Sequence, residues 1–575
     1  MSKLVVVLSG QIVRENSANL MNFWKGFINI QNTIYDIDDL EIIAHSWNPE
    51  FNQLVENVYD IKILSSQKQQ SFVKEFMPLI NPVNKFEKGL KRVDSTWKNV
   101  SAQTIFGQIK SKIKSISLLN KLNISDDTLV LSTRWDIGCS GSLAVNSLNF
   151  DTSLSPDYLY LAYFSEVDEG YADMWFLGSY QNIKKFEAYE NHLLESISDK
   201  NSYFDDFTNN GWTLAIAKDK VYEFVKRYKI AILNKILIKV PFNLFKRLLP
   251  FIKNKIIGLE QRIKNNIELP FLSGENSLLK DSKTSVLFPD YQALNIHAIL
   301  KSFILDNGLR EKTRFLDVND FVKTHNGQMI NSLDFAYVIY SHSSYSDCWD
   351  MAIGQAKECL PENCKKIYLV SDNSSETIEA FIKFKNDEKV ELLIYENEQK
   401  YTNRLIKAFS EVNVKFDFIY FVHEDMPLVN KVDKVYLNTL LHYMNNSNEF
   451  YIKLVDTNYV DKKEDHSSFP NLVHNSGGYS FSVQASLMKP DFLVSFLGNF
   501  DTDIYGLEQI CIESNFKFSA VKGDVKVGRY LLNNNYFPHI STAISKGKWV
   551  TSEWKDDITY LSDKYNIDLS IRGEV

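Results

Sequence analysis

Two adjacent acidic residues follow an apolar run in the second half of this chain. The run covers residues 418–422 and leads directly into His423, Glu424 and Asp425. An uninterrupted apolar run of this kind predicts a strand covered on both faces, as in a parallel sheet between helices. Ligands of such sheets bind at the carboxyl ends of the strands. Two carboxylates placed there can hold a divalent cation, a diphosphate through that cation, or a sugar hydroxyl.

Glu508 is a second acidic candidate. It follows a short acidic segment that begins at Asp503, and we expect a helix over residues 509–514. An acid beside the first turn of a helix is favoured by the helix dipole in any case. The functional alternative is a general base that takes the proton from an acceptor hydroxyl. Both interpretations stay open on the sequence alone.

Small polar residues follow the first two strands expected in this half. Ser341, His342 and Ser343 form a loop in which backbone N–H groups can approach a nucleotide or phosphate. A plain turn is the alternative for this loop. Asp372 follows the next strand, where it can hold a base or ribose, or cap the N-terminus of a helix.

Two basic residues of this half are candidate partners for a diphosphate. Arg404 lies near the start of an expected helix, and Lys548 lies in a tail that could fold back over the site. Either cation can neutralise a diphosphate. For Arg404, a surface position without a ligand is the simpler alternative.

A glycine-bearing loop enters a strand further along. Gly477 and Gly478 would allow the backbone to approach a sugar closely. Tyr479 or Phe481 could then stack on the sugar ring. A hairpin turn is the alternative.

The first half of the chain carries a comparable set of candidates for substrate binding. They share positions beside expected strands, and they are Ser9, Gly10, Gln11, Arg14, Arg134, Asp136 and Asp173. Asp136 could bind a metal or a ribose. Arg134 could equally be its structural ion-pair partner, which would leave the pair inert.

Alternating strand-like and helix-like segments must position these residues. The expected strands are residues 4–8, 40–44, 61–64, 128–131, 335–340, 366–370, 392–395 and 418–422. Such alternation predicts mostly parallel sheets. A chain of 575 residues is too long for one core. We therefore predict two α/β domains with Rossmann-like, mostly parallel sheets, at 1–215 and 331–575, joined by a helical middle segment at 216–330.

The middle segment is distinctive in charge. Residues 220–264 carry twelve Lys or Arg against two acids. This stretch is either a connector with a solvated basic face or a surface that docks on anionic lipid. Residues 266–328 look mainly helical and carry no motif that indicates chemistry.

Composition excludes several classes of protein. A net charge of −8 argues against general binding to nucleic acid. The five cysteines form no CxxC pair, which argues against a zinc site or a disulfide scaffold and favours a reducing compartment. The chain has no run of 18 apolar residues, so no transmembrane helix is expected. These features predict a cytoplasmic protein, with peripheral contact at the inner face of a membrane through 220–264 as the variant.

The second half resembles GT-A type glycosyltransferases of bacteria and viruses, of the kind associated with capsule and lipooligosaccharide synthesis. The matching pieces are Tyr340–His342 with Trp349, Tyr368–Asp372, Val422–Asp425, Leu507–Glu508 and Gly547–Trp549. The first half is similar to another transferase-like group, through Leu8–Arg14, His45–Trp47, and Arg134 with Asp136. The resemblance implies two transferase-like domains in tandem.

The resemblance also implies a reaction. It implies a nucleotide-sugar donor, a glycan acceptor and often Mn²⁺ or Mg²⁺, in the synthesis of surface polysaccharide or glycoconjugate. Asp425, with Glu424, would organise the donor diphosphate, and Glu508 would act as the base. Asp425 and Asp136 are the candidate metal ligands.

The sequence departs from the family at one point, because the usual Asp-x-Asp is replaced by His423–Asp425. A metal-independent site that uses Arg404 or Lys548 is therefore an option. Two other functions stay open. One is a non-catalytic carbohydrate-binding or assembly protein on transferase-like domains, and the other is a sugar nucleotidyltransferase.

Overall fold

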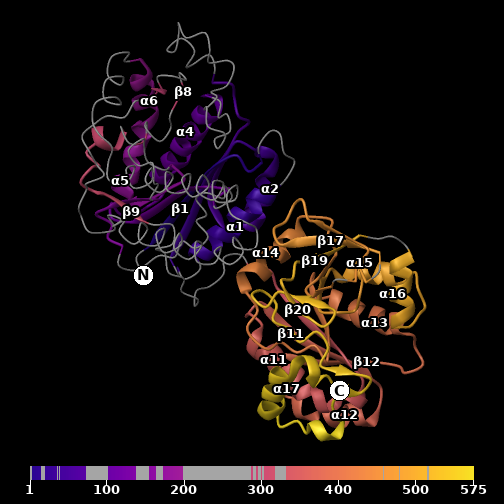
Figure 1. Cartoon of the computed structure of the whole chain (residues 1–575). Helices are drawn as coiled ribbons and strands as arrows, with labels where there is room; N and C mark the ends of the chain where they lie inside the picture. The colour runs from indigo at the N-terminus through magenta and orange to yellow at the C-terminus, as the bar shows by residue number, and fades with distance from the viewer. Residues whose placement is uncertain are drawn as a thin grey trace, which may run out of the picture. The chain divides into compact units, whose positions relative to one another are not determined.

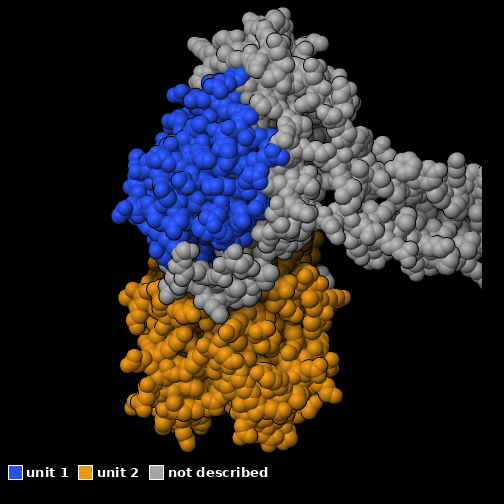
Figure 2. All heavy atoms as spheres, turned by 90° about the vertical axis from the view of Figure 1, so that its left-hand side faces the viewer, with its two compact units in different colours: residues 1–18, 29–328 blue, residues 19–28, 329–575 orange. Residues whose placement is uncertain are grey.

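The computed structural model describes residues 3–13, 20–34, 37, 39–72, 102–137, 154–162, 173–198, 287–288, 293–294, 300, 303–316, 332–457, 459–477, 479–513 and 517–575. Arg14, Gly478 and the basic stretch 220–264 lie outside these residues, so the expectations for them stay predictions. The chain divides into two compact units, each described here by itself (Figure 2). Unit 1 comprises Met1–Ala18 and Asn29–Gln328, and unit 2 comprises Asn19–Ile28 and Met329–Val575.

Unit 1 contains a mixed sheet. Over the described residues the strand order is β3-β2-β1-β4-β6-β5-β9. The strands are β1 Leu4–Gly10, β2 Leu40–Ser46, β3 Ile61–Ser66, β4 Leu129–Arg134, β5 Leu159–Ala162, β6 Trp175–Ser179 and β9 Thr313–Leu316. Strands β3, β2, β1 and β4 are parallel, as predicted, and β6 runs antiparallel to β4 and β5.

One expectation for unit 1 is corrected at the described part of residues 266–328. Strand β9 lies inside the segment that we expected to be mainly helical. It is extended because it pairs in parallel with β5, from Leu159 opposite Thr313 to Ala162 opposite Leu316. A short hairpin of β7 (Leu287–Phe288) and β8 (Ala293–Leu294) lies in the same segment. The α-helices described before residue 200 are α1 Met21–Ile34, α2 Asn52–Val58, α4 Ala102–Ser117, α5 Tyr180–Lys184 and α6 Tyr189–Ser198.

Unit 2 contains a larger mixed sheet (Figure 1). Its order over the described residues is β12-β11-β10-β13-β18-β14-β19-β17-β16. The strands are β10 Phe335–Tyr340, β11 Cys364–Asp372, β12 Val390–Tyr395, β13 Ile419–His423, β14 Tyr451–Lys453, β16 Lys462–Asp465, β17 Leu472–Ser476, β18 Ser486–Met488 and β19 Phe518–Val521. Strands β12, β11, β10 and β13 are parallel, whereas β18 runs antiparallel to β13 and β14.

Smaller elements complete unit 2. The remaining strands are β15 Asp456–Thr457, β20 Val525–Val527, β21 Tyr530–Leu532, β22 Ile544–Ser545 and β23 Lys548–Trp549. The α-helices are α11 Trp349–Cys359, α12 Ser375–Phe381, α13 Tyr401–Asn413, α14 Lys434–Asn445, α15 Pro490–Leu497, α16 Ile504–Glu513 and α17 Thr551–Tyr565. None of the helices in the described ranges is long and apolar enough to cross a membrane.

The parallel strands of unit 2 bring the predicted polar loops to one edge. Strand β10 covers the predicted range, and β13 is buried along Ile419–Val422. The ring of Phe409 on α13 packs edge-on against Phe421 at 5.6 Å, which anchors that helix on the sheet. Tyr340 lies opposite both Val370 and His423 in register. The residues that follow β10, β11 and β13 therefore meet at the carboxyl edge.

The helix that contains Glu508 begins earlier than predicted, so the predicted start at residue 509 is wrong. Helix α16 begins at Ile504, so Glu508 lies in its second turn. The carboxylate of Asp503 accepts a hydrogen bond of 2.8 Å from the N–H of Gly506 and serves the first turn instead. The helix dipole favours acidic residues only within the first turn. It therefore does not explain an acidic residue at position 508.

Candidate active site

Glu424 and Asp425 directly follow β13, and both are buried. The backbone N–H of Glu424 donates to the carbonyl of Tyr340, the last residue of β10, at 3.3 Å. The carbonyl of Asp425 also accepts a bond of 2.8 Å from the N–H of Ala543. The chain around β22 is thus fixed against the acid pair.

The acid pair concentrates negative charge. Burial raises the pKa of Glu424 well above its usual value, and the charge of Asp425 raises it further. Burial also raises the pKa of Asp425. Arg572 acts on Glu424 from nearby, but it is already paired with Asp347, with 2.7 Å from Nε to Oδ2. Among the described residues, neither carboxylate forms an ion pair within 4.0 Å, so the pair favours a proton or an added cation.

Asp372 ties the loop after β10 to the end of β11. Its carboxylate accepts bonds from the backbone N–H of Ser343 at 2.6 Å and from the Ser343 hydroxyl at 3.0 Å. Burial alone would raise its pKa, but hydrogen bonds from Ser374 and Ser343 hold the pKa below its usual value. The ring of His342 accepts a bond of 3.1 Å from the N–H of Ser344. The N–H groups of Ser343 and Ser344 are therefore engaged within the protein.

Arg404 is held at the start of α13. Its Nε donates to the carbonyl of Gln399 at 2.8 Å, and one Nη donates to the carbonyl of Asn397 at 2.6 Å. The guanidinium lies over the ring of Tyr395 at 4.6 Å. These contacts orient the side chain within the protein. The proposed contact of Arg404 with a diphosphate stays a prediction.

Glu508 lies within electrostatic range of a buried lysine, Lys453, that the sequence did not single out. Burial raises the pKa of Glu508, while the N–H of Val483 and the charges of Lys453 and Arg529 oppose that rise. Lys453 ends β14, is buried, and donates 2.9 Å from Nζ to the carbonyl of Tyr479. Burial lowers the pKa of Lys453 to about 8. A lysine inside the apolar run 450–455 was the available signal.

The start of α13 links the end of β13 with the segment that leads into α16. The side chain of Tyr401 is buried there, and its hydroxyl lies 3.0 Å from Nε2 of His423. Burial raises the pKa of Tyr401 well above its usual value, and Tyr340, Glu508 and Glu424 add to the rise. The next residue, Thr402, donates its N–H to the carbonyl of Thr502 at 3.2 Å, just before α16, so the start of α13 bonds both to the end of β13 and to the segment that leads into α16.

In the glycine loop, packing explains Gly477, and only one of the two rings predicted to stack on a sugar is exposed. Gly477 has φ of +79°, and a Cβ there would lie 1.9 Å from Oδ2 of Asp461. Glycine at 477 is therefore required by packing against Asp461. Phe481 is buried in the core, so of the two predicted stacking rings only that of Tyr479 is exposed. Lys548 is exposed on β23, the hairpin partner of the strand that begins at Ile544.

The candidates of unit 1 also gather at the carboxyl ends of the parallel strands, around helix α4. The N–H of Gly10 donates to the hydroxyl of Ser111 at 2.7 Å. The ammonium of Lys112 donates to the carbonyl of Asp173 at 2.7 Å and also senses the charge of Arg134. Burial lowers the pKa of Lys112 to about 8.

Other candidates of unit 1 bond to protein groups. The Ser9 hydroxyl donates to the carbonyl of Thr133 at 3.3 Å, and the amide of Gln11 donates to that of Gln69 at 2.6 Å. Both carboxylate oxygens of Asp136 accept bonds from Arg134, each at 2.8 Å. A role for Asp136 in metal binding stays a prediction, and a metal would have to displace this guanidinium.

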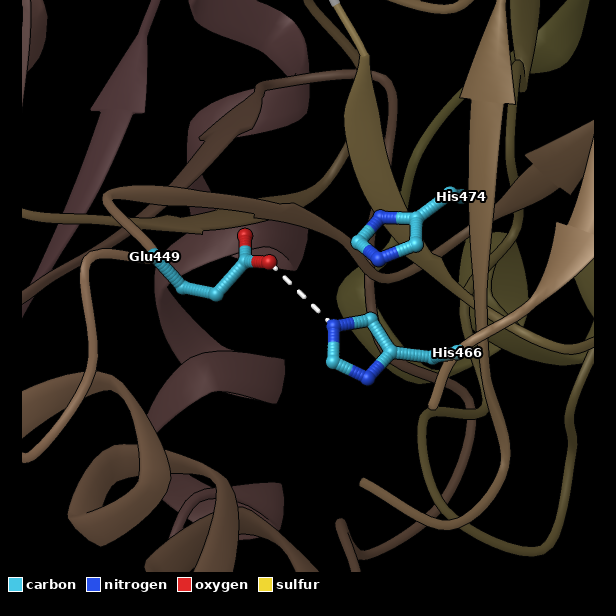
Figure 3. A group of neighbouring side chains, drawn as sticks. All are labelled: Glu449, His466 and His474. Carbon is cyan, nitrogen blue, oxygen red and sulfur yellow. Dashed lines mark hydrogen bonds and ion pairs between the residues drawn. The ribbon is translucent and has the colours of Figure 1, made fainter. Parts of the chain in front are cut away.

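A separate cluster in unit 2 has metal-ligand residue types. Ligand atoms of Glu449, His466 and His474 lie within 4.8 Å of one another (Figure 3). Nδ1 of His466 accepts the backbone N–H groups of Ser468 at 3.1 Å and Phe469 at 3.0 Å. The proton of the neutral ring must then lie on Nε2, which is 3.3 Å from the Glu449 carboxylate.

This tautomer of His466 disfavours metal binding by the cluster. A metal bound at Nε2 would move the ring proton to Nδ1, against two backbone donors. The Ser519 hydroxyl completes the network, 2.9 Å from Glu449 and 3.3 Å from Nδ1 of His474. We therefore interpret the cluster as a hydrogen-bonded network that closes the turn after β16.

Comparison with known proteins gives weak matches. No protein-family model matches the chain, and no curated protein matches it. The S. aureus protein TarS, residues 1–349, matches with a TM-score of 0.24 and 12% identity over 35% of this chain and 61% of that chain. The same TarS fragment also matches in complexes with UDP and UDP-GlcNAc.

Two further solved structures match. GalNAc-T7 with UDP, GalNAc and Mn²⁺ has a TM-score of 0.17 and 16% identity over 20% of this chain and 21% of that chain. The 4-diphosphocytidyl-2C-methyl-D-erythritol synthase of Anaerococcus prevotii has 0.25 and 11%, over 41% and 99%. In the first TarS match and in the GalNAc-T7 match, the chain spans 61% and 21% of the other chain, less than two thirds of each. At these TM-scores the matches carry no argument about activity, which depends on the residues described above.

Proposed function

We propose that unit 2 is a glycosyltransferase that moves a sugar from a nucleotide-sugar donor to a hydroxyl of a glycan acceptor. The observation that supports this most is the position of α13, where Tyr401 bonds to His423 beside the acid pair and Thr402 bonds to Thr502 just before α16. A buried acid pair at the end of a parallel strand and a separate carboxylate with a raised pKa are thereby brought together. Donor binding and acceptor activation need these two kinds of group at one site.

The proposed reaction assigns different roles to the two sets of carboxylates. Glu508 takes the proton of the acceptor hydroxyl, and the oxygen attacks the anomeric carbon of the donor. The bond between that carbon and the diphosphate breaks, and the diphosphate leaves with the electron pair. The raised pKa of Glu508 suits a base that works near neutral pH.

The residues at the end of β13 fit a divalent cation. Glu424 and Asp425 offer oxygen ligands, which Mg²⁺ and Mn²⁺ accept. Burial raises the pKa of both carboxylates, as expected where negative charge lacks a counter-ion. A cation bound there would neutralise charge on the leaving diphosphate. Arg572, Arg404 and Lys548 supply positive charge from the protein itself.

A thermal-shift screen tests the proposal. The full chain is heated with UDP, GDP, CMP and dTDP sugars, with and without Mn²⁺. A ligand at 100 times its Kd stabilises the folded state by about 2.7 kcal/mol, so a donor is detectable even when it binds weakly. We expect stabilisation by one class of nucleotide sugar, and its loss in Asp425→Asn. Stabilisation by glycans but by none of the nucleotide sugars would favour the binding-protein alternative, whereas nucleoside triphosphate turnover would favour the nucleotidyltransferase.

The proposal also covers the glycan product and the role of unit 1. The glycan product would be a surface polysaccharide or glycoconjugate, and unit 1 would be a second transferase-like domain. Substituting Asp136 with alanine should then abolish one linkage and spare another. If neither linkage is lost, unit 1 is a scaffold or a binding module.

A further inference from the structure

Two exposed tyrosines lie next to each other in unit 2. The side chains of Tyr459 and Tyr479 are 59% and 41% exposed. Their ring centroids are 6.2 Å apart, with 65° between the ring planes. Neighbouring aromatic rings that stay in water offer apolar faces on which a sugar ring can stack.

The backbone of Tyr479 is held in an unfavourable conformation. Its φ is +56°, and it is the only aromatic residue with positive φ in the part of the chain that the structure describes. A bulky residue in this left-handed region costs conformational free energy, which the surrounding structure must supply. The bond of 2.9 Å from the buried ammonium of Lys453 to the Tyr479 carbonyl fixes this conformation.

Hydrogen bonds join Tyr459 to Arg529 through Thr457. The hydroxyl of Thr457 donates to the carbonyl of Arg529 at 3.0 Å and accepts the N–H of Tyr459 at 3.2 Å. Arg529 in turn lies close enough to Tyr479 and Glu508 for both to act on its charge. Tyr459 and Tyr479 are therefore neighbours, Tyr459 is tied to Arg529 through Thr457, and the charge of Glu508 acts on Arg529.

We propose that Tyr459 and Tyr479 form the acceptor subsite, and that they stack on a neutral hexose or N-acetylhexosamine ring of the glycan. Arg529 donates hydrogen bonds to the hydroxyls of that sugar, and Lys453 is the positioning residue for Tyr479. The inference rests on the proposed function, because it takes Glu508 as the base for that acceptor. It adds the class of acceptor and the residues that bind it.

The test measures glycan binding by the full chain. Methyl β-glucoside, methyl β-galactoside, N-acetylglucosamine, lactose and chitobiose are titrated by ligand-observed NMR. Tyr459→Ala and Tyr479→Ala should each raise the Kd of the preferred glycan about tenfold, the range expected for loss of one stacked ring. Tyr479→Phe keeps the ring and should stay within about twofold of the original protein. Tyr560→Ala is the matched control, since Tyr560 is an exposed tyrosine on α17.

The outcomes separate this inference from the proposed function. Equal Kd values for the alanine variants and the original protein would overturn the subsite. Binding of a nucleotide sugar without binding of any of the five glycans would also overturn it. If glycan binding depends on the two tyrosines but no nucleotide sugar binds, the subsite stands and the transferase function falls.

Discussion

The ammonium of Lys453 donates a hydrogen bond of 2.9 Å to the backbone carbonyl of Tyr479. The lysine ends a buried strand, whereas the tyrosine lies in the loop that follows the glycine at 477. The same ammonium also lowers the pKa of Glu508, against the effect of burial. One buried charge therefore both shapes the loop and sets the acidity of the proposed base.

Glu508→Gln should remove the base and leave the donor site intact. We expect kcat to fall by roughly 10²–10⁴, the usual contribution of general base catalysis. The thermal shift produced by the nucleotide sugar should not change, because the acid pair remains. Glu513→Gln on the same helix is the control, since that side chain is exposed. Full turnover by Glu508→Gln with its true substrates would disprove the assignment.

Lys453→Met should move the pH dependence of the reaction. The positive charge of Lys453 lowers the pKa of Glu508, so its removal raises that pKa. A base must be ionised to work, and the acid limb of the kcat profile should therefore move to higher pH. Lys462→Met serves as the control because Lys462 is exposed on β16. An acid limb at the same pH in Lys453→Met and in the original protein would contradict the coupling.

Asp425→Asn should raise stability at alkaline pH. The folded-state pKa of Asp425 is raised, so the stabilisation by its bound proton is complete below the unfolded pKa and disappears as the pH rises through the folded pKa. Each unit of such a shift corresponds to about 1.4 kcal/mol. The Tm of the variant should exceed that of the original protein at pH 8, with a smaller difference at pH 4.

The control for this experiment is Asp417→Asn, which changes an exposed aspartate just before β13. It should leave the pH dependence of Tm unchanged. If Asp425→Asn changes Tm by the same amount at pH 4 and pH 8, then ionisation of Asp425 does not destabilise the folded protein.

His466→Asn should preserve the turn that His466→Ala loses. An asparagine carbonyl can accept the N–H groups of Ser468 and Phe469 in place of Nδ1. We expect His466→Ala to cost about 1 kcal/mol or more of unfolding free energy and His466→Asn less. Zn²⁺ should not raise the Tm of the original protein through this cluster. A Zn²⁺-dependent rise in Tm that His474→Ala abolishes would show a metal site instead.

The sequence by itself determined the elements around the acid pair. The apolar runs at β10, β11, β12 and β13 are long, uninterrupted and flanked by polar loops, so strand formation follows from local composition. Parallel pairing then requires the residues after those strands to share an edge, which places Ser341, Asp372 and Glu424 together.

Only the tertiary structure decided which side chains remain free to act. The hydrogen bonds that Asp372 accepts and the burial of Phe481 depend on neighbours that no local pattern encodes. Lys453 meets Glu508 and Tyr479 only when β14, α16 and the glycine loop pack together. Electrostatic coupling acts through space, so charges distant in sequence acquire a shared role only in the folded chain.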